Sequence, residues 1–453
     1  MRIFAGTRVL FQIALRNLIQ ARRRTGVLFL AVGTVTAMLV LLQAMSAGIN
    51  DNMVTAATTL SAGEINVAGF YKVTPGSAAP IVTNAAAVRK IVEENTPGLD
   101  YTLERHRSWG KAVSETGTVQ TGLTGIIPKQ EDRFFHTLQL AKEKDYVEGG
   151  RDEVIGDPRQ LSEPHTVVLF ANQAKRLGVK VGDVITYKTE TQVGRANTLD
   201  LKVVGVAKDL GLLSSFSCFT QKETVLELGQ LDPDTTGAIW VYLKNIDDAP
   251  AVMAHLREVL TAHGYRLMDY NPNPFFFKFE DVQGEDWTGQ KLDLTLWKDE
   301  VSFLSWVIIA FNTVTWFLTS ILVAIITIGI MNAMWQSVRE RTREIGTMRA
   351  VGLSRVQTLL LFMAEAVLLG LGSTVAGSGV GVVISLAVDA ANIHVPIEAM
   401  ASILLSDRIH LSVKPGTVVA AIGFLTTFTG LSALWPAIRA ALLQPVKALA
   451  HVE

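Results

Sequence analysis

Residue sets that could carry out covalent or metal chemistry are scarce in this chain of 453 residues. It has a single cysteine, Cys218, which excludes an intrachain disulfide or a cysteine-based metal site and is expected to be a small buried side chain. The eight histidines include no HExxH motif and no pair at ligand spacing beside a carboxylate cluster. The phosphate-binding pattern Gly-x-x-x-x-Gly-Lys-Ser/Thr is also missing. We therefore expect a non-catalytic chain with no cofactor, no metal and no nucleic-acid partner.

The charged segment at residues 331–357, MNAMWQSVRERTREIGTMRAVGLSRVQ, is the most informative part of the sequence. Glu340 with Arg343, and Arg341 with Glu344, are three positions apart and can pair on the surface of a short helix that also has an apolar side. Such a helix can dock a partner protein. Alternatively, its arginines can serve only to fix membrane topology. The residues alone leave both interpretations open.

Two features within the following apolar stretch carry further predictions. Glu365 is ionisable where an unpaired charge is costly, so it is expected to pair with an inner-side arginine or with Asn332 rather than to handle cargo. A stripe of small residues at four-residue spacing allows another helix to approach closely. The approaching helix can belong to the same chain or to a second copy. The stripe consists of Ser373, Gly377, Gly381 and Ser385.

Four long apolar stretches indicate an integral membrane protein. The chain is 49% hydrophobic and 18% charged with a mean hydropathy of +0.30, which is too apolar for an ordinary soluble domain. A crossing helix needs about 20 apolar residues, so a cleaved signal peptide, with an apolar core of about 7 to 15, fits the first stretch less well. The second stretch is long enough to project beyond the membrane. The four predicted spans are residues 26–48, 301–335, 356–388 and 417–438.

Three short basic segments set the predicted orientation. Residues 1–25, 336–355 and 436–453 together hold 13 Lys and Arg but three Asp and Glu. Excess positive charge marks the cytoplasmic side, so both termini are placed inside, in a bacterial cytoplasmic (inner) membrane in contact with the lipid bilayer. The other parts follow from this: an N-terminal amphipathic helix at 1–25, an outer domain at 49–300, an inner helix at 336–355, an outer loop at 389–416 and an inner tail at 439–453.

The long insertion between the first two spans is predicted to be an α+β domain of one or two lobes. Asn84 and Asp248 stand where the first residues of two helices are expected, and Gly182 stands in a turn. Aromatic residues 275–279 can contact an apolar cargo, but packing in a strand core fits them better. The predicted strands are residues 167–170, 183–189, 199–207 and 239–244.

The sequence NAMWQSVRERTREIGTMRAVG at residues 332–352 resembles the cytoplasmic coupling segment of the FtsX-like (MacB/LolC-type) ABC transporter permeases. IALRNLIQARRRTGVLFL at 13–30 is similar to the family's N-terminal helix and first span. VVLFANQAKRLGVKVGDVITY from 167, with LKVVGVAKD, resembles its outer domain, and WPAIRAALLQPVKALA at 435–450 its C-terminal signature. Residues 210–300 and 389–416 lie outside the resemblance.

The resemblance implies a four-span membrane protein that works as a dimer, with a second permease copy or a paralogue. It further implies two copies of a separate ABC ATPase subunit, with movement passed along extended first and second helices to the outer domain. Since the phosphate-binding loop is missing, the ATPase is expected on another chain. A periplasmic adaptor or carrier protein is a further expected partner. The residues that would contact the ATPase are Arg339, Glu340, Arg341, Arg343, Glu344, Ile345, Gly346 and Arg349.

The expected function is that of the permease subunit, which couples ATP hydrolysis to movement, export or release of a lipidic or amphipathic substrate such as a lipoprotein. The alternative is a mechanotransmitting subunit that activates an extracytoplasmic enzyme without transport. A sensor would need a cytoplasmic signalling domain, for which the inner segments are too short. A membrane-anchored enzyme would need a nucleophile or carboxylate motif that the sequence does not offer.

Overall fold

The computed structural model describes residues 2–191, 194–215, 217–302, 305–393 and 408–444. The chain divides into two compact units, and each is considered by itself. The membrane unit consists of Met1–Asp51, Ile308–His394 and Arg408–Glu453. The inserted unit is built from Asn52–Val307. This division confirms the predicted fold class, in which a large α+β domain is inserted after the first of four candidate membrane helices.

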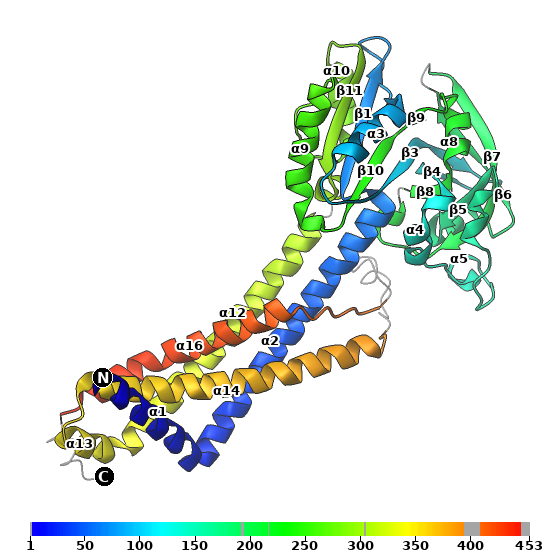
Figure 1. The fold of residues 1–453 in the computed structure, drawn as a ribbon. Helices are drawn as coiled ribbons and strands as arrows, with labels where there is room; N and C mark the ends of the chain where they lie inside the picture. The colour runs from blue at the N-terminus through cyan, green and yellow to red at the C-terminus, as the bar shows by residue number, and fades with distance from the viewer. Residues whose placement is uncertain (1, 192–193, 216, 303–304, 394–407, 445–453) are drawn as a thin grey trace. The chain divides into compact units, whose positions relative to one another are not determined.

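The described residues of the membrane unit are mostly helical, with non-helical connections at 351–354, 391–393 and 408–414 (Figure 1). Four of its helices are long and apolar enough to cross a bilayer. The helix α14 packs along α16 and also against α1. The helices are α1 Arg2–Gln20, α2 Arg22–Ala56, α12 Ser305–Glu340, α13 Thr342–Ala350, α14 Arg355–Ala390 and α16 Pro415–Leu442.

The first two long helices exceed the spans predicted from hydropathy. The prediction ended the first span at residue 48, whereas α2 continues to Ala56 and then into a π turn, Ala57–Ser61. The polar residues at 50–52 end the apolar stretch, but with neither Gly nor Pro among them they do not break the helix. The 36 residues of α12 measure about 54 Å at 1.5 Å per residue, well above the roughly 30 Å of hydrocarbon. This length is consistent with the prediction that the second span projects beyond the membrane, which stays a prediction.

The inserted unit is organised around one nine-stranded sheet, with strand order β11-β1-β10-β3-β4-β8-β5-β7-β6. The 15-residue strand β3 joins its two halves, because residues up to Arg105 pair with β10 and residues from His106 pair with β4. The strands are β1 Ile65–Lys72, β2 Val82–Thr83, β3 Leu99–Val113, β4 Thr118–Ile126, β5 Thr166–Phe170, β6 Val184–Glu190, β7 Ala196–Ala207, β8 Ser217–Gln221, β9 Thr235–Thr236, β10 Ala238–Leu243 and β11 Gly289–Leu296.

Short helices cover the sheet and separate its strands. The α-helices of this unit are α3 Ala85–Asn95, α4 Asp132–Thr137, α5 Glu143–Tyr146, α6 Ala171–Leu177, α7 Leu212–Ser215, α8 Lys222–Gly229, α9 Ala249–Ala262, α10 Phe279–Gly284 and α11 Trp297–Glu300. The 3-10 turns are η2 Pro128–Gln130, η3 Pro158–Ser162, η4 Ile246–Asp248 and η5 Phe275–Lys278.

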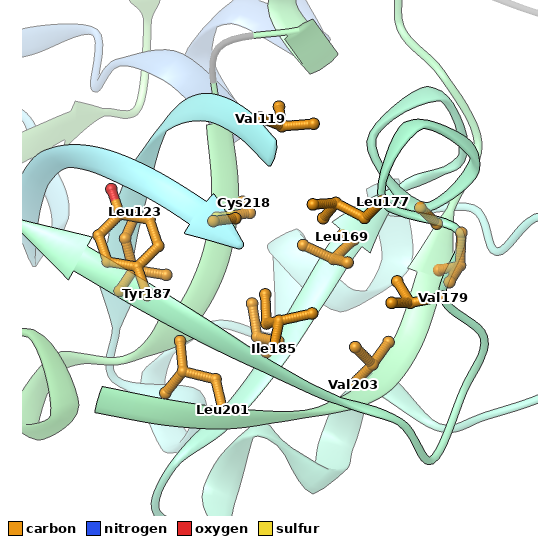
Figure 2. Close-up of a cluster of buried hydrophobic side chains, with 14 of the residues drawn as sticks. Val119, Leu123, Leu169, Leu177, Val179, Ile185, Tyr187, Leu201, Val203 and Cys218 are labelled. Atoms are coloured by element: carbon orange, nitrogen blue, oxygen red, sulfur yellow. The ribbon is translucent and has the colours of Figure 1, made fainter. Parts of the chain in front are cut away.

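Each half of the sheet has its own apolar core. Figure 2 shows the core beside β4 to β8, where Leu123, Ile185, Tyr187 and Cys218 lie together with alternate residues of neighbouring strands. Cys218 is fully buried, as predicted, and burial raises the pKa of its thiol to about 12. The four predicted strands are confirmed as β5, β6, β7 and β10.

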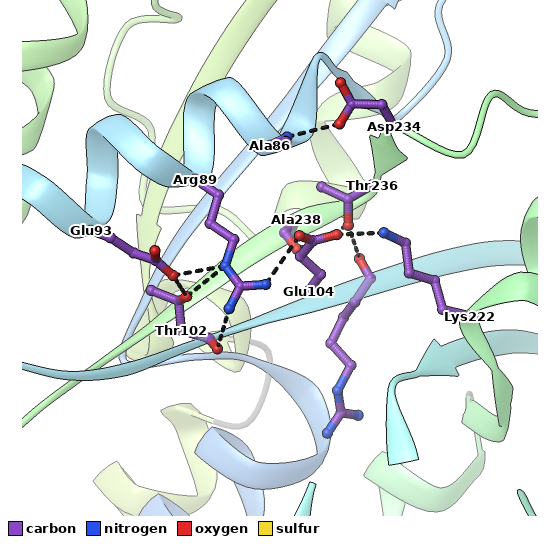
Figure 3. A network of polar contacts seen from close by, with 10 residues as sticks. Ala86, Arg89, Glu93, Thr102, Glu104, Lys222, Asp234, Thr236 and Ala238 are labelled. Atoms are coloured by element: carbon purple, nitrogen blue, oxygen red, sulfur yellow. Dashed lines mark hydrogen bonds and ion pairs between the residues drawn. The ribbon is translucent and has the colours of Figure 1, made fainter. Parts of the chain in front are cut away.

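A polar network fastens helices from both halves to the shared strand β3. Glu104 on β3 pairs with Arg89 of α3 at 3.3 Å and with Lys222 of α8 (Figure 3). Arg89 also pairs with Glu93 one turn further along α3 at 2.8 Å. Because the charges are opposite and partly withdrawn from water, each helix is held in a fixed register on the sheet.

Two local predictions need correction. Asn84 precedes α3 as expected, but it is left-handed at φ 51° and its side chain caps nothing; the carboxylate of Asp234 instead accepts from the backbone N–H of Ala86 at 2.9 Å. The aromatic residues at 275–279 form the turn η5 and the start of α10 rather than a strand. The buried pair of Lys278 with Asp293 at 2.7 Å holds this turn against β11, a long-range contact that local sequence does not reveal.

Candidate functional site

The charged helix α13 is a separate helix because the chain bends at both of its ends. At its start Arg341 leaves helical geometry, with φ −109°, and separates α12 from α13. At its end Gly352 adopts φ +114°, a conformation that disfavours any side chain. The side chain of Ser354 then accepts from the backbone N–H of Gln357 and caps the start of α14. A charged helix is thus held between two membrane helices.

Arg341 ties this bend to the interior of the membrane unit. Its Nε lies 2.9 Å from Glu344 on α13, and its Nη1 lies 3.0 Å from Glu365 on α14. The side chain of Glu365 is 5% exposed. A carboxylate in that position needs a cationic partner. The prediction that Glu365 pairs with an inner-side arginine is therefore confirmed.

Arg349 fastens the other end of α13. Its Nη1 donates to the carbonyl of Ala441 at 2.8 Å and to that of Leu443, at the C-terminal end of α16. The last carbonyls of a helix have no partner within the helix, so a cation there satisfies them and complements the helix dipole. Arg349 therefore holds α13 to α16, which is a different task from the predicted contact with an ATPase.

The predicted contact residues divide into an exposed and a buried group. Ile345 is 1% exposed and Gly346 is buried with it, so within a single chain neither offers surface to another protein. These two residues form the apolar side by which α13 packs on its own chain. Their contact with the ATPase stays a prediction. The exposed group, named here the docking face, consists of Arg339, Glu340, Arg343 and Glu344.

The small-residue stripe of α14 packs against α2 of the same chain. A side chain on Gly377 would place its Cβ 2.2 Å from the carbonyl oxygen of Gly33, and one on Gly381 would lie 2.9 Å from that of Ala37. Ser373 and Ser385 turn their hydroxyls back to carbonyls of their own helix, those of Leu369 and Gly381. Since all four stripe residues are buried in one chain, the packing interpretation holds and the dimer-seam alternative does not. Sequence reasoning did not identify Gly33, the partner on α2.

The π turn that follows α2, Ala57–Ser61, is fastened to the sheet of the inserted unit. The buried Arg105 donates to the carbonyl of Thr59 at 3.2 Å, Arg107 donates to that of Ser61, and the hydroxyl of Tyr242 donates to that of Thr58 at 2.7 Å. The side chain of Arg105 also pairs with Glu131 at 2.7 Å. Three otherwise unpaired helix carbonyls are thus bound by β3 and β10.

A cavity of about 490 Å³ opens beside these arginines, within the size range of small-molecule sites. Its walls include Arg107, Trp109, Trp240, Phe276 and Glu300. Burial lowers the pKa of Arg107, against the attraction of Glu300, and burial raises the pKa of Glu300. Sequence reasoning noted the aromatic run but missed this cavity, because its walls come from strands distant in sequence.

Within the described ranges, no three His, Cys, Asp or Glu residues form a cluster that could hold a metal ion.

Two family models match this chain. The MacB-like periplasmic core domain matches residues 26–259, and the FtsX-like permease C-terminal model matches residues 316–445. The first match covers more than half of the chain, and the second includes most of α12 and all of α13, α14 and α16.

Curated relatives match parts of the chain. The macrolide export ATP-binding/permease protein MacB of Chlorobaculum tepidum is 38% identical over 125 residues, which are 27% of this chain and 17% of that protein. The pyoverdine export ATP-binding/permease protein PvdT of Pseudomonas syringae is 35% identical over 122 residues, or 27% and 16% of the two chains. The ABC transporter permease YtrF of Bacillus subtilis is 25% identical over 269 residues, or 58% and 53%. The chain thus spans about a sixth of the two export proteins and about half of YtrF.

Solved structures include the extracellular domain of the transporter YknZ from Gram-positive bacteria, at 12% identity and a TM-score of 0.29 over 44% of this chain and 95% of that one. The periplasmic region of MacB from Actinobacillus actinomycetemcomitans matches at 17% identity and a TM-score of 0.28, over 48% and 89%. The extent of the family matches, across the inserted unit and the later membrane helices, is what decides the assignment: this chain belongs to the FtsX-like, MacB-type family of ABC transporter permeases.

Proposed function

We propose that the chain is the permease subunit of an ABC transporter and couples ATP hydrolysis by a separate ATPase subunit to movement in the inserted unit. Two ATPase copies and a second permease chain, identical or paralogous, complete the complex. It lies in a bacterial inner membrane with both termini in the cytoplasm. The inserted unit then lies outside, where a periplasmic adaptor or carrier protein can reach it.

The observation that carries this proposal is the fastening of α13. Its docking face leaves Arg343 and Glu344 exposed, while Arg341 and Arg349 bind it to α14 and α16. A force applied to the docking face therefore reaches three membrane helices, α12 through the chain and the other two through these arginines. A segment that served only as a topology signal would need positive charge but no such bracing.

The far end of α2 supports the same proposal. Because Arg105, Arg107 and Tyr242 bind the carbonyls of the π turn that follows it, an axial movement of α2 would pull directly on β3 and β10. The sheet joins both halves of the inserted unit through β3, so the pull would be distributed over the whole unit.

For the substrate, we propose a lipidic or amphipathic molecule, with a lipoprotein as one candidate. The names of the relatives, which refer to macrolide export and pyoverdine export, support export of a small molecule as another. The second candidate function is mechanical activation of an extracytoplasmic enzyme, which the bracing of α13 and α2 would serve equally well. Transport of a labelled substrate into inverted membrane vesicles, dependent on ATP, distinguishes the two.

Charge reversal on the docking face tests the proposal. Arg343→Glu and Glu344→Lys should reduce retention of the ATPase subunit about tenfold or more, since a reversed charge buried at an interface costs several kcal/mol. Folding should hardly change, because exposed ion pairs contribute about 0.3 to 0.5 kcal/mol. The measurement is the amount of ATPase subunit that copurifies with the tagged chain from native membranes.

The matched control is Lys90→Glu, which reverses an equally exposed charge in the inserted unit, where the Lys90 side chain is 74% exposed. It should leave ATPase retention unchanged. Wild-type retention in both docking-face variants would show that the segment is a topology signal, and the proposed function would lose its main support.

A further inference from the structure

The cavity of the inserted unit is lined by residues of that unit that are close in sequence to α2 and to α12. Arg107, in its wall, donates to the carbonyl of Ser61, the last residue of the π turn that ends α2. Glu300, also in its wall, is the last residue of α11 and lies five positions before the start of α12 at Ser305. A molecule in this cavity would therefore touch the anchoring groups of both helices.

Five aromatic residues contribute to the cavity wall: Trp109, Trp240, Phe275, Phe276 and Phe279. Trp109 and Phe276 lie with ring centroids 5.3 Å apart, and the buried ring of Trp240 lies beneath the guanidinium groups of Arg105 at 4.5 Å and Arg107 at 5.9 Å. Phe276 is 44% exposed, so part of its side chain is open to a ligand. Aromatic walls favour flat apolar bodies, which bury surface there without losing hydrogen bonds.

The turn that carries Phe276 is rigidly held, so the wall is preformed. Glu300 accepts from the backbone N–H of Phe275 at 3.2 Å and from the hydroxyl of Thr295 at 2.7 Å. Lys278 is bound to the fully buried Asp293 at 2.7 Å, and the ring of Phe275 stacks on that of Phe70 at 4.4 Å. Preformed walls reduce the entropy lost on binding.

Arg107 determines which polar group a ligand of this cavity must carry. One of its N–H groups donates to Ser61, and in the ranges that the structure describes its other N–H groups have no protein acceptor. A guanidinium group can donate but never accept, so a ligand must present an oxygen acceptor to it. The neighbouring Arg105 is charge-paired with Glu131, but its Nη1 has no hydrogen-bond partner among the described residues, so it can assist Arg107 in binding that acceptor.

We infer that this cavity binds an amphipathic molecule with a flat apolar body and a carbonyl or carboxylate oxygen directed at Arg107. The inference rests on the proposed function, since it names the substrate class that the inserted unit would receive. A ligand in the cavity would alter the contact of Arg107 with Ser61 at the end of α2, because the ligand and Ser61 share the Arg107 side chain. An ATPase bound at the other end of α2 and α12 could thus respond to substrate.

The test uses the full chain in lipid nanodiscs, without ATPase or nucleotide, and two single-residue variants. The native Cys218 is buried, so Phe276→Cys or Phe277→Cys supplies the one accessible thiol. Phe276 lines the cavity, whereas its neighbour Phe277 is 63% exposed and lies outside the wall, which makes the second variant the matched control. The rate of labelling by N-ethylmaleimide is measured with 2-naphthoate, 2-naphthamide or 2-naphthylmethylammonium present.

We expect naphthoate and naphthamide to slow labelling at position 276 several-fold and to leave position 277 unchanged. The ammonium compound, which has no acceptor, should protect far less. Adding Arg107→Gln to the Phe276→Cys chain should remove the difference between the three compounds. If that variant fails to fold, the comparison of labelling at positions 276 and 277 still tests whether the compounds bind in the cavity.

Three results would overturn the inference: no protection at 276, equal protection at both positions, or equal protection by the ammonium compound. The proposed function fails separately, through wild-type ATPase retention in the docking-face variants. If position 276 is protected but the docking-face variants retain the ATPase at the wild-type level, the chain has a ligand site but does not couple to an ATPase through α13.

Discussion

Single arginines carry much of the organisation of the membrane unit. Arg341 serves two carboxylates on different helices, Glu344 on α13 and Glu365 on α14. Only the second of these contacts is withdrawn from water, since the Glu344 side chain is 63% exposed and that of Glu365 is 5% exposed. The two ion pairs therefore contribute differently to stability although they share one guanidinium group. The exposed pair orients the arginine, and the buried pair joins the helices.

This difference is testable with two conservative substitutions. Glu365→Gln should lower the free energy of unfolding by about 1 to 3 kcal/mol, because it weakens a buried charge-assisted hydrogen bond. Glu344→Gln should change it by no more than about 0.5 kcal/mol, because its pair is exposed. The measurement is thermal unfolding of each variant in the same detergent. Equal effects of the two substitutions would contradict the assignment of Glu365 as the residue that joins α13 to α14.

At the scale of elements, the contact between α2 and α14 depends on glycine at position 377 of α14. A Cβ there would lie 2.2 Å from the carbonyl oxygen of Gly33 on α2, whereas a Cβ on Gly33 would make ordinary contact at 3.4 Å. Such contact replaces the hydrophobic driving force, which is missing between helices in lipid, with close van der Waals packing. It joins the helix that leads to the inserted unit to the helix that Arg341 connects to α13.

Alanine substitutions at Gly377 and Gly379, two positions apart on α14, test this contact separately from helix propensity. Gly377→Ala should destabilise the chain by about 1 to 3 kcal/mol, because the new methyl group meets a backbone carbonyl that cannot yield. Gly379→Ala meets nothing within 4 Å and should be neutral or slightly stabilising. Both changes alter helix propensity equally, so the difference in melting temperature reports packing alone. A Gly377→Ala chain as stable as the Gly379→Ala chain would show that the helices do not touch there.

The elements were largely predictable from the sequence, whereas their contacts were not. Hydropathy identified four spans, and short strand-like segments identified the strands that became β5, β6, β7 and β10, because these signals are local. The partner of Glu365 was predicted to be an inner-side arginine or Asn332, and the structure pairs it with Arg341. The bond of Arg349 to α16, the burial of Ile345 and the cavity beside Arg107 escaped prediction, because each depends on residues far apart in sequence.

For the whole molecule, the proposed topology can be read from two engineered thiols. Val73 is 70% exposed in the inserted unit, Thr347 is exposed on α13, and Cys218 is buried and should not compete. Val73→Cys should react with a membrane-impermeant maleimide in spheroplasts, and Thr347→Cys should react only after permeabilisation. The reason is that basic segments remain in the cytoplasm while the long insertion is exported. The reverse labelling pattern would invert the topology.

The strand order of the inserted unit also has a consequence for biosynthesis. The strand β1 lies between β10 and β11, so Ile65 must wait for Val241 and Leu296 before its backbone is paired on either side. At synthesis rates of about 5 to 20 residues per second, the newly made β1 stays unpaired for on the order of ten seconds. Its apolar residues are open to wrong pairing throughout that interval. If the inserted unit is exported, as proposed, its folding should therefore depend on periplasmic holding chaperones more strongly than its final stability would suggest.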